Sequence, residues 1–210
     1  MPAPITNQIT ICNSALLKVG ADVIVSITDN NRAAIVCNTL YNYLRDEVMG
    51  ESPWRFATFR AVLVPNSTVP AFDYLYSYDI PSDCLRLLKT YSDNINWIVE
   101  SGQILTNETS LDMIYLQRNT DESTWDARFC EAFAWRIAME LAMPLTKNIP
   151  IQQMCATNYE KSLAQARAMN AVIGTQSNLI ADIWSGARRG DKSWRAQQGQ
   201  TGDGNTYGPV

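Results

Sequence analysis

Apolar side chains recur every three or four residues in two stretches near the start of the chain, a spacing typical of amphipathic α-helices. The first stretch covers residues 6–19, with Thr6 as the expected N-cap and Gly20 where a helix-ending glycine belongs. The second covers residues 30–49, and Gly50 is expected to end it. The expected inward positions are Ile9, Cys12, Leu16 and Val19 in the first helix, and Ala33, Val36, Cys37, Leu40, Leu44 and Val48 in the second. Arg32, Arg45 and Glu47 fall largely off the second stripe.

The pattern changes after residue 52. From residue 53 to about residue 119 the segments are short, rich in β-branched and aromatic residues, and separated by turn residues, which predicts strands. The predicted strands are TFRAVLVP, YLYSYDIP, LRLLKTY, NWIVE, QILTN and LDMIYLQ. Ser101 and Gly102 are expected to form a hairpin turn between the fourth and fifth. The aromatic run PAFDYLYSYDIP fits a strand edge with one buried aromatic face better than a sugar-stacking platform.

Helical spacing returns near residue 124. The first of these helices is expected over residues 124–143, with large apolar side chains four apart and Pro144 as its stop. The last is expected over residues 150–173, with Pro150 in its first turn and Gly174 after its end. Their expected inner faces are Trp125, Phe129, Phe133, Ile137 and Leu141, then Ile151, Met154, Cys155, Tyr159, Ser162, Ala166, Met169 and Ile173.

These patterns together predict an α+β fold: a four-helix bundle with an antiparallel β insertion between helices 2 and 3, and an extended C-terminal tail. The expected parts are the first helical pair at residues 1–52, the β-rich insertion at 53–120, the second helical pair at 121–175 and a C-terminal docking tail at 176–210.

The chain of 210 residues contains no histidine. This removes Ser-His-Asp and Cys-His catalysis, histidine-containing zinc sites and the usual near-neutral proton shuttle. The five cysteines form no C-x-x-C pair and lie in apolar segments, which indicates small core residues in a reducing compartment. We therefore expect no enzyme activity, no catalytic residue, no metal and no cofactor.

The net charge of −4 argues against a free nucleic-acid-binding protein, which usually presents a basic face. No stretch approaches the roughly 18 apolar residues of a membrane span. We expect a soluble protein made in the cytoplasm and no membrane contact.

The C-terminal segment of residues 176–210 carries six of the ten glycines and little apolar surface, so by itself it is expected to be disordered. It also carries residue types that anchor interfaces. The candidate docking residues, for a partner protein or a neighbouring subunit, are Trp184, Arg188, Arg189, Trp194 and Arg195. The segment SGARRGDKSWR is either a solvated linker or a docking arm, and the second interpretation is favoured.

Carboxylate pairs offer a second interpretation, because glycoside hydrolysis needs two carboxylates and no histidine. The available pairs are Glu108 with Asp112, Asp121 with Glu122, and Glu131 with Glu140. With 21 acidic residues in the chain some pairing is inevitable, so catalysis is the weaker alternative.

The stretch ICNSALLKVGADVIVSITDNNRAAIVCNTLYNYLRDEVMGESPWRFATFRAVL combines a helix ending in L-x-x-x-G, a short link, a helix with an alanine-rich turn and spaced leucines, and a W-R-F entry to the first strand. YDIPSDCLRLLK, a hairpin and a second helical pair follow in order. Over roughly residues 6 to 174 this arrangement resembles the tail tubular protein A family, the head-to-tail adaptors of short-tailed bacteriophages.

The resemblance implies a structural virion protein at the head–tail junction. Members of that family form a twelvefold ring that joins the portal protein to the tail nozzle protein and lines the DNA exit channel. Genome DNA would pass through the lumen without sequence-specific binding, and an acidic lumen would repel its phosphates during ejection. The rival classes are a carbohydrate-active tail enzyme and a stand-alone binding module.

Overall fold

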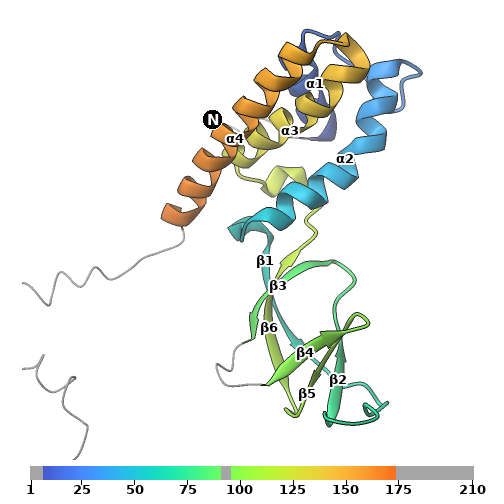
Figure 1. The fold of residues 1–210 in the computed structure, drawn as a ribbon, viewed down its shortest axis with the longest axis vertical. Coiled ribbons are helices and arrows are strands. Elements are labelled where there is room, and N and C mark those ends of the chain that lie inside the picture. Colours follow the sequence, from blue (N-terminus) through green and yellow to red (C-terminus); the bar gives the residue numbers. More distant parts are fainter. Residues whose placement is uncertain (1–6, 91–95, 174–210) are drawn as a thin grey trace, which may run out of the picture. The chain divides into compact units, whose positions relative to one another are not determined.

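The computed structural model describes residues 7–90 and 96–173. Residues 1–171 form one compact unit and residues 172–210 a second, of which only the two residues that end the last helix are described. The described part has an α+β fold with four α-helices and two small antiparallel three-stranded sheets between helix 2 and helix 3 (Figure 1). This confirms the predicted fold class, while the predicted tail lies outside the described residues.

The first helical pair consists of α1 (Gln8–Val19) and α2 (Arg32–Glu51). Each begins at an asparagine whose side-chain oxygen accepts a backbone N–H of the first turn. Asn7 accepts from Thr10 and Asn31 from Ala34, both at 2.8 Å. The expected N-cap Thr6 is therefore wrong, because Asn7 takes that position. Gly20 ends α1 as predicted, in the left-handed conformation with a φ of 76°.

Two details of α2 differ from the sequence prediction. The helix continues through Gly50 to Glu51, because a glycine ends a helix only when its backbone turns left-handed, and Gly50 does not. Arg45 is buried, with 7% of its surface exposed. Its guanidinium donates to the side chains of Asn42 and Asp46, so its charge is satisfied while its apolar stem packs inward.

The second helical pair consists of α3 (Ala127–Thr146) and α4 (Ile149–Ile173). Pro144 lies inside α3, so its expected role as a stop is wrong. Its ring removes one backbone donor, but the Thr146 hydroxyl donates to the Ala142 carbonyl at 2.6 Å. Lys147, with a φ of 53°, closes the helix by donating to Met143. α4 begins one residue before Pro150.

The inward faces of this pair are confirmed for α3 and partly corrected for α4. All five predicted α3-side positions, from Trp125 to Leu141, are buried. On α4, Met154 and Met169 are 45% and 41% exposed, and Leu163 is buried in their place. The reason is that α4 packs through a narrow strip, so flanking positions stay exposed. That strip is Cys155, Tyr159, Leu163 and Ala166.

The insertion holds all six predicted strands. Their bounds are β1 (Thr58–Leu63), β2 (Tyr76–Asp79), β3 (Cys84–Thr90), β4 (Trp97–Glu100), β5 (Gln103–Thr106) and β6 (Leu111–Gln117). The sheet orders are β1-β6-β3 and β2-β5-β4. Short 3-10 turns, η1 (Arg55–Ala57) and η2 (Glu122–Thr124), lie beside the two connections to the helices. Ser101 and Gly102 have φ values of 50° and 78°, so the predicted two-residue hairpin turn is confirmed.

Two clusters of buried side chains support these elements. The larger lies among the four helices and includes the aromatic rings of Trp54, Phe56, Trp125, Phe129 and Phe133. The smaller lies within the insertion and consists of Tyr78, Ile104, Leu111, Met113 and Tyr115. The five cysteines are free thiols, of which Cys12, Cys37 and Cys155 are buried in the larger cluster.

Candidate interaction surface

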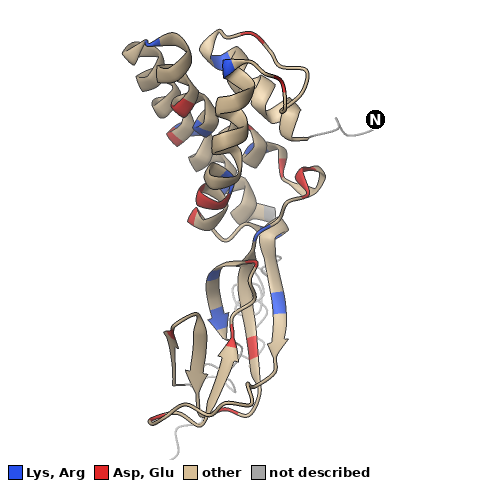
Figure 2. Ribbon diagram, turned by 90° about the vertical axis from the view of Figure 1, so that its right-hand side faces the viewer, with Lys and Arg blue, Asp and Glu red and all other residues tan. Residues whose placement is uncertain are grey.

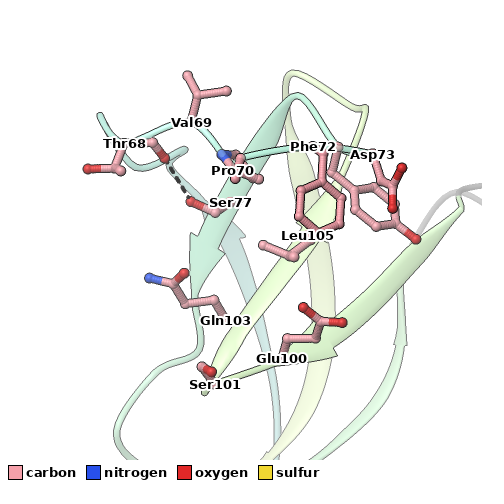
Figure 3. A pocket seen from close by; sticks show the side chains of 12 residues that line it. Thr68, Val69, Pro70, Phe72, Asp73, Ser77, Glu100, Ser101, Gln103 and Leu105 are labelled. Atoms are coloured by element: carbon pink, nitrogen blue, oxygen red, sulfur yellow. Dashed lines mark hydrogen bonds between the residues drawn. The ribbon is translucent and has the colours of Figure 1, made fainter.

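The five predicted docking residues, Trp184, Arg188, Arg189, Trp194 and Arg195, lie outside the described residues. A different surface is formed within the described part, on the sheet β2-β5-β4. A hollow of about 480 Å³ lies between the loop of residues 68–74 and the β4–β5 hairpin (Figure 3). We call it the insertion hollow. Its lining residues are Thr68, Val69, Pro70, Ala71, Phe72, Asp73, Tyr74, Ser77, Glu100, Ser101, Gln103 and Leu105.

The loop above the hollow is tied to the sheet by polar side chains. Asn66 donates its amide to the Asp79 carboxylate at 3.0 Å, and Gln103 donates to the same oxygen at 2.9 Å. Ser77 donates to the Thr68 carbonyl at 3.2 Å. These contacts fix both ends of the hollow on the strands, so its shape is formed before any partner arrives.

The tip of this loop is a tight turn. The Tyr74 N–H donates to the Phe72 carbonyl at 2.8 Å, which closes a three-residue γ-turn around Asp73. Asp73 has a φ of 68°, which is sterically costly for a residue other than glycine. The turn leaves the Phe72 ring 77% exposed. Figure 3 shows this ring on the same side of the hollow as Asp73, with Leu105 below it.

The charged side chains that line the hollow are all acidic. Its lining includes two carboxylates, Asp73 and Glu100, and no basic side chain. No Lys or Arg occurs between Arg60 and Arg86, nor between Lys89 and Arg118. In Figure 2 the end of the insertion away from the helices accordingly carries acidic positions and no basic ones. The surface therefore suits a ligand that is both cationic and apolar.

The aromatic run of residues 70–81, which contains β2, gave a partial signal for this surface. The predicted strand edge with one buried aromatic face is confirmed, since Tyr78 is fully buried. Burial raises the pKa of the Tyr78 phenol, whose O–H donates to the Glu108 carbonyl at 2.7 Å. Phe72 precedes the strand and is exposed, and sequence reasoning did not single it out. The exposure of Phe72 depends on the left-handed backbone conformation of Asp73, which cannot be predicted from the residue pattern.

A second group of polar contacts joins α2 and α4 at the entry to the insertion. The Glu51 carboxylate accepts from the Tyr159 hydroxyl at 3.0 Å and from Arg167 at 2.9 Å. Burial, and then the nearby Glu51 charge, raise the pKa of Tyr159. Asn170 donates to the Pro53 carbonyl at 3.0 Å and accepts from the Arg55 N–H at 2.9 Å. The last turns of α4 thus hold the backbone where the chain leaves α2.

Acidic residues near the end of α2 would repel the negative end of the helix dipole unless cations neutralise them. Each of them has an arginine partner from another element. Asp46 accepts from Arg118, which follows β6, at 2.7 Å. Glu47 accepts from Arg136 of α3 at 3.1 Å. The Asp46–Arg118 pair attaches the exit of the insertion to α2, whereas the Glu47–Arg136 and Glu51–Arg167 pairs join α2 to α3 and α4.

The outer faces of the first helical pair expose large apolar side chains. Ile35 and Tyr43 lie eight residues apart on α2 and are 53% and 69% exposed. Leu17 on α1 is 66% exposed, beside a shallow hollow lined by Thr10, Asn13, Ser14 and Lys18. These side chains face water although the core beneath them is complete.

Most of the candidate catalytic carboxylates have structural partners. Glu131 pairs with Lys18 at 3.1 Å, and Glu140 pairs with Arg136. Asp121 accepts from the Ser123 N–H at 3.1 Å, and Glu122 accepts from Tyr41 at 3.2 Å. Glu108 and Asp112 are both exposed.

Residues 7–90 and 96–173 contain neither a candidate membrane-spanning helix nor a candidate metal cluster. No helix in these ranges is long and apolar enough to span a membrane. No group of three or more His, Cys, Asp or Glu side chains in them has a geometry that could hold a metal. No protein-family model matches this sequence, and no curated protein matches it.

Proposed function

We propose that this protein is a structural adaptor of a phage virion, which assembles with copies of itself into a ring between the portal and the tail nozzle. The genome would pass through the lumen of this ring without sequence-specific contacts. The proposal assigns the protein to the head–tail junction, with assembly in the host cytoplasm. It assigns no catalytic step to any side chain.

The observation that carries the proposal is the set of exposed apolar side chains on the outer faces of α1 and α2. Large apolar groups gathered on a surface are typical of interaction sites. Ile35 and Tyr43 project from one side of α2, so a neighbouring bundle packed against that side would cover both. A head-to-tail contact of this kind forms a closed ring when the rotation between neighbouring subunits is a whole fraction of 360°.

Two further features support the proposal. The order of elements, a helical pair, a β insertion and a second helical pair, is the one that the sequence resemblance implies. The insertion is attached to the helices at its exit by the Asp46–Arg118 pair and at its entry by the hydrogen bonds of Asn170 with Pro53 and Arg55. A part held at both its entry and its exit can transmit contacts from one end of an adaptor to the other.

The test is to mix the full-length protein with the portal protein encoded by the same phage genome and to measure the mass of the complex by native mass spectrometry. We expect a stoichiometric complex with twelve copies of this chain. The isolated chain is allowed to remain monomeric until the portal templates the ring. Failure to form a stoichiometric complex, when both proteins are folded, would contradict the proposal.

Paired variants test the proposed lateral contact. Ile35→Arg combined with Tyr43→Arg should prevent ring completion, because charged side chains would be desolvated between neighbouring bundles. Ser82→Arg combined with Thr109→Arg adds the same two charges at exposed positions of the insertion and serves as the control. Equal ring yields from both double variants would show that the outer face of α2 is not the contact.

A further inference from the structure

We propose that the insertion hollow is the binding site for residues 185–195 of a second copy of this chain. The inference deepens the proposed function and rests on it, because a ring places the same pair of surfaces together at every subunit boundary. It names the surface that receives the arginine- and tryptophan-containing segment predicted from the sequence to be a docking arm.

The first argument is the form of the hollow. Phe72 and Val69, at 77% and 64% exposure, present apolar surface that the insertion does not use for its own core. The hydrogen bonds from Asn66 to Asp79 of β2, and from Ser77 of β2 to the Thr68 carbonyl, hold this surface in place. A preformed site avoids the entropy cost of ordering its own loop when a ligand binds.

The second argument is charge. Asp73 and Glu100 line the hollow without any basic neighbour in the lining set. Residues 185–195 carry four basic side chains and one acidic side chain. Arg188 and Arg189 present planar guanidinium groups, which form paired hydrogen bonds with carboxylates and also stack on aromatic rings.

The third argument is the apolar complement. Trp194 and Arg195 are consecutive in the sequence, so the segment carries an indole and a cation on adjacent residues. A tryptophan that packs on Phe72 and Leu105 would bury apolar surface on both partners. An arginine over the Phe72 ring would add a cation–π contact. The glycines of the segment place little side-chain bulk between these groups and the hollow.

The fourth argument is reach. The described chain ends at Ile173, and residues 174–184 separate it from the segment. Fully extended, this spacer covers about 36 Å, which is the scale of one neighbouring bundle. A single contact of this kind is weak, since exposed ion pairs contribute little by themselves. Repetition around a ring raises the effective concentration of each segment at the next hollow.

The test uses a fluorescein-labelled peptide of residues 183–196, titrated with the full-length protein and followed by fluorescence anisotropy. We expect a dissociation constant on the order of 10–100 µM, typical of a small interface, and weaker binding as salt is raised. A peptide of residues 196–209, from the same tail but without Arg or Trp, should not bind.

Matched variants locate the site. Phe72→Ala and Glu100→Gln should each weaken binding by about fivefold or more, and Phe72→Tyr should retain it. Asp112→Asn removes the same charge from an exposed position outside the hollow, and Val62→Ala removes an exposed apolar side chain from β1. Both controls should bind as the wild type does. Circular dichroism of Phe72→Ala should match the wild type, because the side chain is exposed.

Three outcomes would overturn the inference. They are no binding by the wild type at 200 µM protein, equal binding of the 196–209 peptide, and an equal loss of affinity in Asp112→Asn. The second copy is tested by placing a photo-reactive benzoylphenylalanine at position 72 of the full chain. Dimers cross-linked through residues 185–195 support the inference, and products within one chain only overturn the choice of occupant.

The results also separate this inference from the proposed function. Specific peptide binding without a portal complex would leave the hollow as a self-association site and contradict the adaptor role. A stoichiometric portal complex that forms equally well with Phe72→Ala and Glu100→Gln, together with no peptide binding, would support the adaptor and remove the hollow from it.

Discussion

The helical part and the β insertion use their aromatic residues in opposite ways. In the helical part, Phe129 is fully buried and its ring lies 5.0 Å from that of Trp54 and 4.9 Å from that of Phe56, measured between centroids. In the insertion, Tyr78 points into a small core while Phe72, six residues earlier, points outward. The aromatic cluster around Phe129 stabilises the helical part from within, whereas the Phe72 ring stabilises no core of the insertion.

The difference follows from the size of the two cores. Four helices enclose one continuous cluster, whereas the separate core of the described insertion consists of five buried apolar and aromatic side chains. Short strands cannot cover both faces of two small sheets. Apolar side chains therefore remain exposed on the insertion, among them Val62, Val64, Val69, Phe72 and Leu75. Exposed apolar side chains on the insertion, which is attached to the well-packed helical part, form a suitable arrangement for binding.

The largest effect is expected for Phe129→Ala. The ring is fully buried and contacts four other aromatic rings, so its loss leaves a cavity among groups that cannot collapse into it. We expect a loss of about 3–5 kcal/mol in the free energy of unfolding. Urea denaturation followed by the helical signal in circular dichroism measures it. A loss below about 1 kcal/mol would mean that the aromatic cluster is not the main support of the helices.

Ile104→Ala is expected to have a smaller and more local effect. Ile104 lies on β5 and is fully buried in the core of the insertion. The expected cost is about 2–4 kcal/mol. Because this core is separate from the helical one, hydrogen exchange should accelerate in β2, β5 and β6 and stay unchanged in α3. Equal acceleration in α3 would show that the two cores unfold as one unit.

Alkaline pH should lower the stability of the helical part by a smaller amount. Burial raises the pKa of Tyr41 and Tyr159, and the carboxylates of Glu122 and Glu51 beside them raise it further. Above pH 10 the unfolded chain loses these protons while the folded chain keeps them, so stability falls as pH rises. Each tyrosine contributes about 1.4 kcal/mol per pH unit in that range.

The measurement is the free energy of unfolding in urea between pH 9 and pH 11. Tyr159→Phe should make the fall with pH shallower, while Tyr43→Phe, on the exposed face of α2, should leave it unchanged. Burial also raises the pKa of the Cys130 thiol to about 12, so its contribution starts to be lost near pH 9 in every variant. If the free energy of unfolding falls equally steeply with pH in both tyrosine variants, Tyr159 does not contribute to the pH dependence.

Residue spacing was sufficient to predict the elements, because each is amphipathic over its own length. The stripe from Phe129 to Leu141 identified α3, and the turn pair Ser101-Gly102 identified the hairpin. The errors lie where tertiary contacts override a local rule. Pro144 lies in the last turn of α3, which continues to Thr146 and is closed by Lys147, and Arg45 is buried because Asp46 lies beside it.

The insertion hollow was less accessible to such reasoning. It combines side chains from a loop and from a hairpin about thirty residues further along, and its shape depends on the backbone of Asp73. Composition indicated only that the chain as a whole carries a net negative charge. The predicted tail residues could be proposed as anchors from their types alone, but spacing gives no partner for a segment without periodicity.

The stretches without Lys or Arg on either side of the hollow also decide which chemical probes can detect it. Trypsin cleaves after Lys and Arg, so it finds no cleavage site from residue 61 to residue 85 or from residue 90 to residue 117. Amine-reactive cross-linkers need a lysine and find none in the same stretches. A lysine-based map of an assembled particle would therefore show this surface as empty even when it is occupied. Carbodiimide coupling activates carboxylates such as Glu100 toward a nearby lysine. It can therefore detect contacts at this surface that amine-reactive cross-linkers cannot.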